Sequence, residues 1–567
     1  MCGIFSLLNA DNNDASELQI IETQFYKGQS RGPESSKLVC HFLKTIIGFH
    51  RLAINGLNDV SNQPLIYNNI VLICNGEIYN YKLLYEWMNV SPITGSDCEV
   101  IIHLYLTYGI EQTLRMLDGV YGFILYDFRE GHQQAFMARD PIGVRPLYKL
   151  YNCNNNNNLL NLYGFASELK CVEHFYNINT KNYYIEQFKP GTYSEFKYGQ
   201  NNRDIWSPVI QNKPYYLPTF SYTICTTNHS NRLIYETITK YLHSAVIKRC
   251  MVTERPVACL LSGGLDSSLV SALAADYFDV QPGAPKLETY SIGLEDSEDL
   301  KYARIVAEYI GSKHTEIILT EEEFFNAIPE VIKAIESYDT TTVRASIGNY
   351  LIGKYISLNS QAKVILNGDG SDELFGGYLY MNNCPDNIEF DKETRRLLED
   401  IHLFDVLRSD KSISSNGLEP RTPFLDKTFV NAVLSIPVEI RNHNNLNNPE
   451  KYLLRESFSN HFINAKGHNI LPESILWRKK EAFSDGVSNT KRSLFTVLQE
   501  FIANHYNAQN VTNQFVPSIE LEKTYYKEIF NEAFPNCEHI VPYYWMPKYT
   551  NATDPSARTL TVYHECV

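Results

Sequence analysis

The chain has 567 residues, 44% of them hydrophobic and 20% charged, which is the composition of an ordinary globular protein with room for two or more domains. Its formal charge of −15 and the lack of a lysine- and arginine-rich cluster argue against a nucleic-acid partner held through its phosphates. No run approaches the ~18 consecutive apolar residues of a membrane span, and the opening segment FSLLNADNND lacks the basic flank of a secretory signal.

Residues 1 to about 195 are predicted to form many short strands and few helices. Runs rich in β-branched and aromatic residues predict strands within 45–54, 69–78, 119–128 and 159–167. Apolar residues at helical spacing predict a helix within 97–109. This pattern indicates packed sheets with helices outside. The next segment, 196–230, is rich in proline and asparagine and lacks a clear period, so we predict a connector there.

From residue 231 onward, helical patterns alternate with short apolar strands. The strands are predicted within 256–261, 287–294, 313–319 and 362–368. Such alternation indicates βαβ units around a parallel sheet. From about residue 385 to the end the pattern is mostly helical and irregular. The sequence therefore predicts a second domain of α/β class with a helical C-terminal part, spanning 231–567.

Twelve cysteines are scattered along the chain, and none form a CxxC pair. This distribution argues against a zinc site and against a disulfide framework. A reducing compartment fits best, and we expect a cytoplasmic protein.

The segment VACLLSGGLDSSLVSAL, residues 257–273, is the most specific stretch of the second half. A predicted buried strand meets Ser262-Gly263-Gly264, and an amphipathic helix follows. Paired glycines let backbone N–H groups approach phosphate oxygens, and the helix N-terminus adds its positive dipole end. The hydroxyls of Ser267 and Ser268 add donors, and Asp266 can hold a hard cation such as Mg²⁺. No lysine follows the glycines, so this is not a Walker loop.

SGGLDSS resembles the pyrophosphate loop of the N-type ATP pyrophosphatases, which cleave ATP between its α and β phosphates and leave an adenylated intermediate. A second loop, in KVILNGDGSDELFGGY (363–378), offers Asp372, which could complete a Mg²⁺ site with Asp266. The alternative for this acidic loop is a solvated turn. Further downstream, YDTTTVRAS (338–346), NGLEPRTPFLD (416–426), LWRKKEAFSDGV (476–487) and the tail 543–563 are similar to the synthetase domain of glutamine-hydrolysing asparagine synthetases.

This resemblance implies a set of contacts for ATP, aspartate and Mg²⁺. Lys480 would neutralise the α-phosphate as negative charge develops, although a lysine in a basic run is ordinarily solvent-facing. Asp369 is implied to be catalytic, and Mg²⁺ would be held by Asp266 and Asp372. Arg344 and Arg421 fit structural ion pairs equally well. The implied ATP contacts are Leu261, Ser262, Gly263, Gly264, Asp266, Ser267, Ile292, Asn367 and Gly368, and those for aspartate and the phosphates are Thr341, Thr342 and Arg344.

The acidic loop departs from the family pattern. The family usually has Ser-Gly-Glu-Gly, and this chain has Asn367-Gly368-Asp369-Gly370. Asp369 keeps the carboxylate but shortens its reach by roughly 1.5 Å, one methylene. Because a misplacement of about 1 Å can cost ~100-fold in rate, adenylation is expected to be slower or differently arranged.

The opening residues of the first half, MCGIF, place a cysteine directly after the initiator methionine. On its own, a cysteine at position 2 is a small residue that permits trimming of Met1. Once Met1 is removed, the Cys2 thiolate can attack the side-chain amide of glutamine. Its free α-amino group, with a pKa of about 7.7–8.0, can take and return the proton. This is the chemistry of N-terminal-nucleophile amidohydrolases, and Met1 removal is obligatory for it.

Such a site also needs groups that bind the oxyanion, the α-carboxylate and the α-ammonium of glutamine, and the sequence offers a candidate for each. The Asn75 side-chain amide and the Gly76 backbone N–H can hold the oxyanion. Arg51 can bind the α-carboxylate of glutamine, and Asp97, helped by Glu77, can bind its α-ammonium. Taken singly, Asn75-Gly76 is a hairpin turn and Arg51 a surface arginine. Together these segments are similar to the class II glutamine amidotransferase domain, as are RGPE, LDGVYGF, ARDPIGVRPLY and ASELK.

The amidotransferase resemblance implies an αββα sandwich of the N-terminal nucleophile type over residues 2–195. It implies glutamine contacts at Arg51, Leu52, Ala53, Ile54, Asn55, Asn75, Gly76, Glu77 and Asp97. Two departures occur, because Ser30 replaces the usual histidine before RGPD and Asn55-Gly56 stands where a Val-Asp pair is common. Neither removes a catalytic atom.

We therefore expect glutamine-dependent conversion of aspartate to asparagine through β-aspartyl-AMP, with ammonia passing through an internal route that the family implies. ATP is a substrate and Mg²⁺ a cofactor; nucleic acid and membrane are not expected as partners, and a homodimer is an open possibility. Two alternatives remain: an amide or lactam synthetase adenylating another carboxylate, and a non-catalytic ligand sensor. Glucosamine-phosphate synthase and the phosphoribosyl amidotransferases share the first half, but SGGLDSS excludes them.

Overall fold

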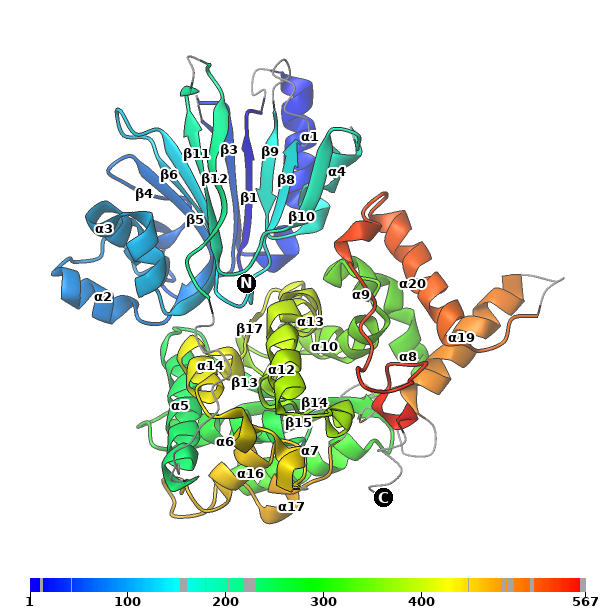
Figure 1. Cartoon of the computed structure of the whole chain (residues 1–567). Coiled ribbons are helices and arrows are strands. Elements are labelled where there is room, and N and C mark those ends of the chain that lie inside the picture. Colours follow the sequence, from blue (N-terminus) through cyan, green and yellow to red (C-terminus); the bar gives the residue numbers. More distant parts are fainter. Residues whose placement is uncertain are drawn as a thin grey trace.

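The computed structural model describes residues 1–10, 14–41, 43–152, 161–178, 180–200, 203–217, 231–446, 448–480, 486, 493–509 and 514–560. These residues fold into two halves that pack against each other, which we call the first half (1–217) and the second half (231–560) (Figure 1). Most of the asparagine-rich segment 152–161, residues 481–485 and 487 of the motif 476–487, and residues 561–563 of the tail motif lie outside the described residues.

Two antiparallel sheets form the described part of the first half. In spatial order, the first sheet consists of β10 (Tyr183–Gln187), β8 (Tyr148–Asn152), β9 (Tyr163–Ala166), β1 (Gly3–Leu8), β3 (Thr45–Arg51) and β2 (Ser35–His41). The second consists of β12 (Trp206–Pro214), β11 (Thr192–Tyr198), β7 (Gln134–Arg139), β6 (Gly119–Asp127), β5 (Ile70–Ile78) and β4 (Leu65–Tyr67). The strands predicted within 45–54, 69–78, 119–128 and 159–167 are confirmed as β3, β5, β6 and β9.

The predicted αββα sandwich is confirmed by where alternate side chains of β1 pack. Ile4 and Leu8 lie in the core between the two sheets, and Phe5 and Leu7 lie in the outer core beneath α1 (Ala15–Tyr26). Because successive strand residues point to opposite faces, a strand buried on both sides is largely apolar. In β1 the one polar side chain, Ser6, is buried and donates to Ile46 O. On the other side of the sandwich, α3 (Val100–Met116) packs on the second sheet. The remaining described helices of this half are α2 (Tyr81–Met88) and α4 (Glu173–Asn177).

The prediction of a connector beginning at residue 196 is wrong for its first part. Strand β11 runs to Tyr198, and β12 pairs with it as the edge of the second sheet. Pro208 and Asn212 obscured this strand in the sequence, yet Trp206 is fully buried and anchors it. An edge strand tolerates proline because one side of its backbone has no partner strand. Residues 218–230 of the predicted connector lie outside the described residues.

The second half is built on the predicted parallel sheet. Its strands, in spatial order, are β15 (Lys313–Leu319), β14 (Glu288–Leu294), β13 (Val257–Leu260), β16 (Val364–Leu366) and β17 (Glu419–Arg421). All of its strand pairs are parallel. Cys259 packs toward one core and Ala258 toward another, so both faces of β13 are covered by helices.

Helices cover both faces of this sheet and form the C-terminal part, as predicted (Figure 1). On one face lie α5 (Asn231–Met251), α6 (Leu265–Asp279) and α7 (Glu298–Ile310), and on the other α10 (Thr340–Asn359) and α13 (Asp405–Ser414). The other helices among the described residues of this half are α8 (Glu321–Asn326), α9 (Ile328–Ile335), α11 (Ser371–Phe375), α12 (Asn387–Asp400), α14 (Lys427–Leu434), α15 (Val438–Arg441), α16 (Tyr452–Ser459), α17 (Glu473–Leu476), α19 (Leu494–Gln509) and α20 (Ile519–Ala533). Among the described residues, none of the helices has the length and apolar character needed to cross a membrane.

The N-terminus of the chain lies where the two halves meet (Figure 1). Met1 is only 1% exposed, and its ammonium donates a hydrogen bond to Leu418 O at 3.0 Å. Nearby, Arg31 and Arg145 of the first half form buried ion pairs with Asp410 of the second, at 2.8 and 3.2 Å. The residue that follows Met1 is thus held at the contact between the halves.

Two candidate active sites

Cys2 lies directly before β1 at the end of the sandwich that faces the second half. Its Sγ donates a hydrogen bond to Leu52 O at 3.5 Å. Burial raises the pKa of the thiol to about 12, so the thiol is neutral at pH 7 and needs a base before it can act as a nucleophile. Burial also lowers the pKa of the Met1 ammonium, to about 5.

Asn75 of β5 is joined to the strand that follows Cys2 through one hydroxyl. Ser167 Oγ accepts a hydrogen bond from Ile4 N at 3.1 Å and another from Asn75 Nδ2 at 3.3 Å. Asn75 is fully buried, and its Oδ1 has no hydrogen-bond partner among the described residues. At Gly76 an added Cβ would lie 2.4 Å from Val120 O, so only glycine fits against β6. Asn75, one of the two residues predicted to hold the oxyanion, is therefore connected to the strand that follows Cys2.

Two buried carboxyl groups lie side by side in the same region. Asn55 Nδ2 is 2.7 Å from Glu77 Oε2 and 3.5 Å from Asp97 Oδ1. Burial raises the pKa of Asp97 to about 6, and burial together with Asp97 raises the pKa of Glu77 well above its usual value. Carboxyl groups with raised pKa values favour the approach of a cation. This pair can therefore accept an ammonium group.

Arg51, at the end of β3, is 7% exposed and is held by the loop that follows it. Its guanidinium donates to Asn58 O at 3.1 Å, to Asn62 Oδ1 at 2.6 Å and to Gly56 O. These bonds fix the position of the guanidinium beside the loop. A guanidinium fixed in this way is suited to bidentate binding of a carboxylate.

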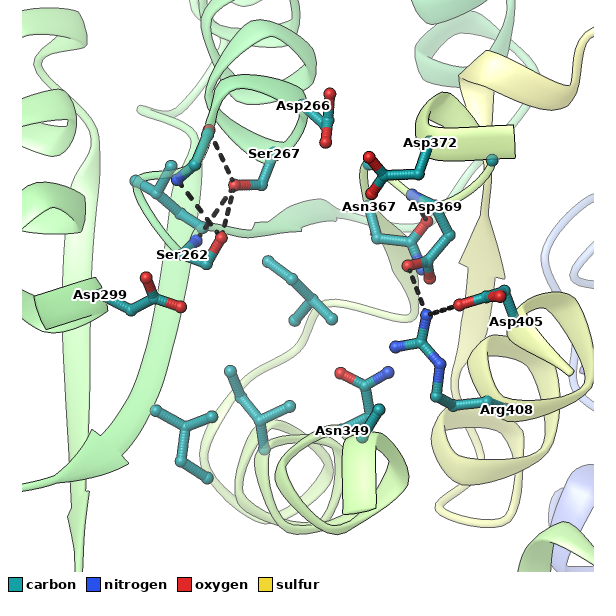
Figure 2. Close-up of a pocket in the computed structure, with 18 of the residues that line it drawn as sticks. Ser262, Asp266, Ser267, Asp299, Asn349, Asn367, Asp369, Asp372, Asp405 and Arg408 are labelled. Carbon is teal, nitrogen blue, oxygen red and sulfur yellow. Dashed lines mark hydrogen bonds and ion pairs between the residues drawn. The ribbon is translucent and has the colours of Figure 1, made fainter. Parts of the chain in front are cut away.

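The second site is formed where strands of the parallel sheet end. The loop Ser262–Gly264 follows β13 and leads into α6, and the hydroxyls of Ser262 and Ser267 lie 3.0 Å apart (Figure 2). Gly263 has φ +73°, and a Cβ there would meet the backbone of Ala303 at 2.4 Å. A Cβ on Gly368 would lie 2.7 Å from Ser267 N. Gly263 thus lets the loop after β13 approach α7, and Gly368 lets the loop after β16 approach the start of α6. Close approach of backbone N–H groups of this kind is what phosphate binding requires.

Two lysines join the carboxylates of these loops. Lys451 Nζ lies 2.5 Å from Asp266 Oδ2 and 2.7 Å from Asp372 Oδ1, and Lys480 Nζ lies 2.7 Å from Asp372 Oδ2. Burial alone would raise the pKa of Asp372, but Lys451 and Lys480 hold it below its usual range. Burial would lower the pKa of Lys480, but Asp372 and Asp266 raise it. The Asp372 carboxylate is therefore ionised and the Lys480 ammonium is charged at neutral pH.

A pocket extends from the serine loop to a second charged group. Figure 2 shows Arg408 of α13 reaching into it between Asn349 and Asp369, opposite Ser262 and Ser267. Arg408 Nη2 donates to Asp405 Oδ1 at 2.6 Å and to Asp369 Oδ1 at 3.2 Å. Further residues of the lining include Tyr290, Ile292, Thr341, Thr342, Ala345, Ile352, Asn367, Glu373, Tyr378, Lys480 and Trp545.

Acidic groups outnumber basic ones at the Arg408 end of the pocket. Burial, followed by Asp405 and Asp372, raises the pKa of Glu373 well above its usual value. The Tyr378 hydroxyl donates to Glu373 Oε1 at 2.6 Å and to Asp405 Oδ2 at 3.2 Å. Burial also raises the pKa of Asp369. A ligand with both a carboxylate and an ammonium would complement this arrangement of one guanidinium among carboxyl groups.

Comparisons with known proteins match the whole length of the chain. The family model of the glutamine amidotransferase domain matches residues 1–207, and that of asparagine synthase matches 237–389 and 382–553. The asparagine synthetase (glutamine-hydrolyzing) of Gallus gallus is 39% identical over 583 residues, covering 100% of both chains. Those of Homo sapiens and Cricetulus griseus are each 39% identical, over 591 and 580 residues, covering 100% and 99% of both chains.

The chain belongs to the glutamine-hydrolysing asparagine synthetases. Within this family member, most residues expected at the nucleotide site line one pocket: Leu261, Ser262, Gly264, Asp266, Ser267, Ile292, Asn367, Gly368, Asp369, Asp372, Thr341, Thr342 and Lys480. Gly263 packs against α7 and is not part of the lining. In the motif around Lys480, residues 481–485 lie outside the described residues.

The expectation that Arg344 lies near the substrates is wrong. Its guanidinium is 3% exposed and forms buried ion pairs with Glu522, at 2.6 Å, and Asp554, at 2.8 Å. Thr341 and Ala345 face the pocket from the same helix, α10, but Arg344 points toward α20 and the tail. Arg421 is likewise a structural ion-pair member, bound to Glu419 at 2.7 Å. Both arginines thus take part in buried ion pairs, and Arg421 also lies 3.4 Å from Glu77 Oε2.

The structure adds residues that the motifs did not indicate. Lys451 lies in no quoted motif, and its link to Asp266 spans 185 residues of sequence. Asp405 and Arg408 sit three residues apart in α13, a spacing that places them on one helix face. This i, i+3 spacing of opposite charges is the sequence signal for the pair. Because the same spacing is common on exposed helices, it does not identify a site.

Proposed function

We propose that the chain makes asparagine from aspartate, with glutamine as nitrogen donor and ATP cleaved to AMP and pyrophosphate. One observation carries the proposal. The same chain holds a half-buried cysteine at position 2, followed by a strand that Ser167 joins at Ile4 to Asn75, and a separate pocket in which the loop after β13 faces Asp372 and Lys480. The relatives that match it from end to end are named asparagine synthetase (glutamine-hydrolyzing).

Glutamine hydrolysis begins with the Cys2 thiol. After Met1 is trimmed, the α-amino group of Cys2 takes the thiol proton while Sγ attacks the amide carbon of glutamine. Asn75 Nδ2 and the Gly76 N–H hold the oxyanion. The α-ammonium of Cys2 returns the proton to the amide nitrogen and ammonia leaves. Water then hydrolyses the thioester, which releases glutamate and restores the thiol. Arg51 binds the α-carboxylate of glutamine, and Asp97 with Glu77 binds its α-ammonium.

Activation of aspartate takes place in the pocket of the second half. A β-carboxylate oxygen of aspartate attacks the α-phosphorus of ATP and pyrophosphate leaves, which gives β-aspartyl-AMP. Ser262, Gly264 and Ser267 donate to the departing phosphates at the start of α6. Lys480 neutralises charge that grows on the phosphates in the transition state. Ammonia then attacks the acyl carbon, and AMP leaves.

Aspartate is oriented by the charged group opposite the serine loop. Arg408 binds its α-carboxylate, because Arg408 uses Nη2 for both of its carboxylate partners and has other donors for a ligand. Asp405 and Glu373 receive the α-ammonium. Asp369, which is shorter than the glutamate usual in the family, reaches Arg408 at 3.2 Å, and so it serves to hold this arginine.

Mg²⁺ fits the carboxylates of the two loops. Asp266 and Asp372 face each other across Lys451, and Asp266 Oδ1 has no hydrogen-bond partner among the described residues. Mg²⁺ is usually held by one or two carboxylates together with substrate phosphates and water. When bound, the ion would neutralise phosphate charge.

Ammonia travels between the sites inside the protein, because at pH 7 free ammonia is mostly protonated and is not a nucleophile. We also propose a cytoplasmic location. All cysteines in the described part of the chain are free thiols, which fits a reducing compartment. A homodimer remains open, and we expect no nucleic-acid partner for a chain of net charge −15.

The test is to incubate the chain with ATP, Mg²⁺, aspartate and either glutamine or ammonium, and to quantify asparagine, AMP and pyrophosphate. We expect Cys2→Ala to abolish only the glutamine-driven reaction. Cys40→Ala, which removes an exposed thiol of the same sheet, should change neither reaction. Release of ADP in place of AMP, or loss of ammonium-driven synthesis in folded Cys2→Ala, would refute the proposal. Binding without turnover would identify a sensor.

A further inference from the structure

The loop 51–56, which carries the expected glutamine contacts, is held from outside by two residues of the second half. Glu254 N donates to Ile54 O at 3.0 Å, and Gly56 N donates back to Glu254 Oε1 at 2.7 Å. Arg255 Nε donates to Ala53 O at 2.8 Å. Consecutive residues of the second half thus bind the backbone of three loop residues.

Arg255 also binds a second segment of the first half, at Glu34. Arg255 Nη2 lies 2.8 Å from Glu34 Oε1, and Glu34 Oε2 accepts the Ala53 N–H at 2.8 Å. Ala53 therefore has its carbonyl bound by Arg255 and its N–H bound by the carboxylate that pairs with Arg255. This closed set of bonds fixes the peptide groups on both sides of Ala53.

The other side of the loop faces the glutaminase site. Leu52 O accepts the hydrogen bond of Cys2 Sγ, and Asn55 Nδ2 contacts Glu77 and Asp97. The side chains of Leu52 and Ile54 are buried in the core of the second half, together with Val257 and Cys259 of β13. The loop 51–56 therefore lies between the Cys2 thiol and the second half and contacts both.

The segment 254–256, which binds the loop 51–56, is anchored to the parallel sheet at Pro256. Pro256 O accepts hydrogen bonds from Lys363 N and Val364 N, at 3.1 and 3.4 Å, and β13 follows immediately between β14 and β16. Glu254 and Arg255 thus lie directly before the central strand of the parallel sheet. A support of this kind can fix a loop more closely than the loop's own backbone could.

We propose that Glu254 and Arg255 are positioning residues for glutamine hydrolysis, by which the second half of the chain shapes the glutamine-binding loop 51–56. The proposal rests on the proposed function of Cys2. Neither residue reaches the reacting atoms in this arrangement; each acts by holding peptide groups whose neighbours contact glutamine. Because misplacement of about 1 Å can cost ~100-fold in rate, such support has a measurable effect.

The experiment measures glutaminase and ammonium-driven synthesis separately in full-length variants. Glu254→Ala should raise the KM for glutamine by about tenfold, the effect of one lost hydrogen bond to a charged acceptor. The KM values for ATP, aspartate and ammonium should stay within about twofold of the wild type, a margin of ~0.4 kcal/mol. Glu254→Gln keeps an acceptor oxygen and should restore most of the affinity. Glu520→Ala, at a glutamate whose side chain is 76% exposed, is the matched control and should change nothing.

Arg255→Met is the second variant, for the case in which Glu254→Ala does not fold. It should raise the KM for glutamine, and Arg255→Lys should recover part of the loss. An unchanged KM for glutamine in a folded Glu254→Ala or Arg255→Met variant would overturn the inference. So would a parallel fall of ammonium-driven synthesis, because that would indicate a purely structural role. A wild type that releases no glutamate from glutamine would instead refute the proposed function.

Discussion

Lys451 donates a hydrogen bond to Asp266 at 2.5 Å and so joins the start of α16 to the first turn of α6. The Lys451 side chain is 2% exposed, and its ammonium also contacts Asp372. Without this ammonium, two carboxylates would face each other in a largely buried place. The loss of one partner from a buried ion pair costs on the order of 3–5 kcal/mol.

Lys451→Met should therefore make thermal stability depend on Mg²⁺. A divalent cation can replace the missing positive charge between Asp266 and Asp372, and a ligand of the folded state raises its stability. We expect the Tm of the variant to rise with MgCl₂ by several degrees more than that of the wild type, measured by scanning calorimetry. Lys466→Met removes an exposed ion pair with Asp279 and is the control. Equal responses of Lys451→Met and the wild type would contradict the metal assignment.

Arg408→Met should impair aspartate use selectively. Loss of a guanidinium that binds the α-carboxylate should raise the KM for aspartate by about 10–100-fold, the range of a lost charge-assisted contact. The KM for ATP should change little, because Arg408 lies at the end of the pocket opposite the serine loop. Pyrophosphate release with ammonium as nitrogen source is the measurement. β-Alanine, which lacks the α-carboxylate, should be discriminated from aspartate much less by the variant than by the wild type.

Arg344→Met should destabilise the protein without changing substrate affinity. It leaves Glu522 and Asp554 buried and unpaired, at a cost on the order of 3–5 kcal/mol. Urea denaturation should show the loss, whereas the KM values for aspartate and ATP of the folded variant should match the wild type at low temperature. A raised KM for aspartate with unchanged stability would indicate that Arg344 contacts the substrates and would contradict a structural role.

Asp97→Asn should weaken glutamine binding and increase the free energy of unfolding at neutral pH. Burial raises the Asp97 pKa from 3.8 to about 6, so between these pH values the folded state binds more protons than the unfolded state. The stability of the wild type therefore falls as pH rises through that window and stays lower above it. At pH 7.5 we expect Asp97→Asn to be more stable by on the order of 2 kcal/mol, with no difference near pH 3.5. Chemical denaturation at both pH values tests this, and the KM for glutamine should rise sharply.

Sequence patterns predicted the architecture well because the apolar runs have clear limits. Strands β13, β14, β15 and β16 each coincide with a short apolar segment, and motifs directly follow β13 and β16. Strand β12 was missed, because proline and asparagine interrupt its pattern and only Trp206 marks it as buried. Tertiary pairing, which a local pattern does not contain, decides such an edge strand.

The site was predicted where motif and backbone coincide, and missed where the partner is distant in sequence. Asp266 and Asp372 follow adjacent parallel strands, so their proximity could be inferred from the two motifs. Lys451 and the Glu254–Arg255 pair could not, because their partners are fixed by the packing of helices and halves. For Arg344 the motif pointed to the substrates, and only the position of Glu522, 178 residues later, reveals its role.

Under the proposed function, the burial of Met1 implies an order of events during biosynthesis. An exopeptidase has to enclose the first residue of its substrate, and here that residue is 1% exposed and bound to the carbonyl of Leu418. Trimming must therefore come before the halves close on each other. A nascent chain has this opportunity while residue 418 is still unmade, and a molecule that folds untrimmed would keep its thiol without the adjoining free amine.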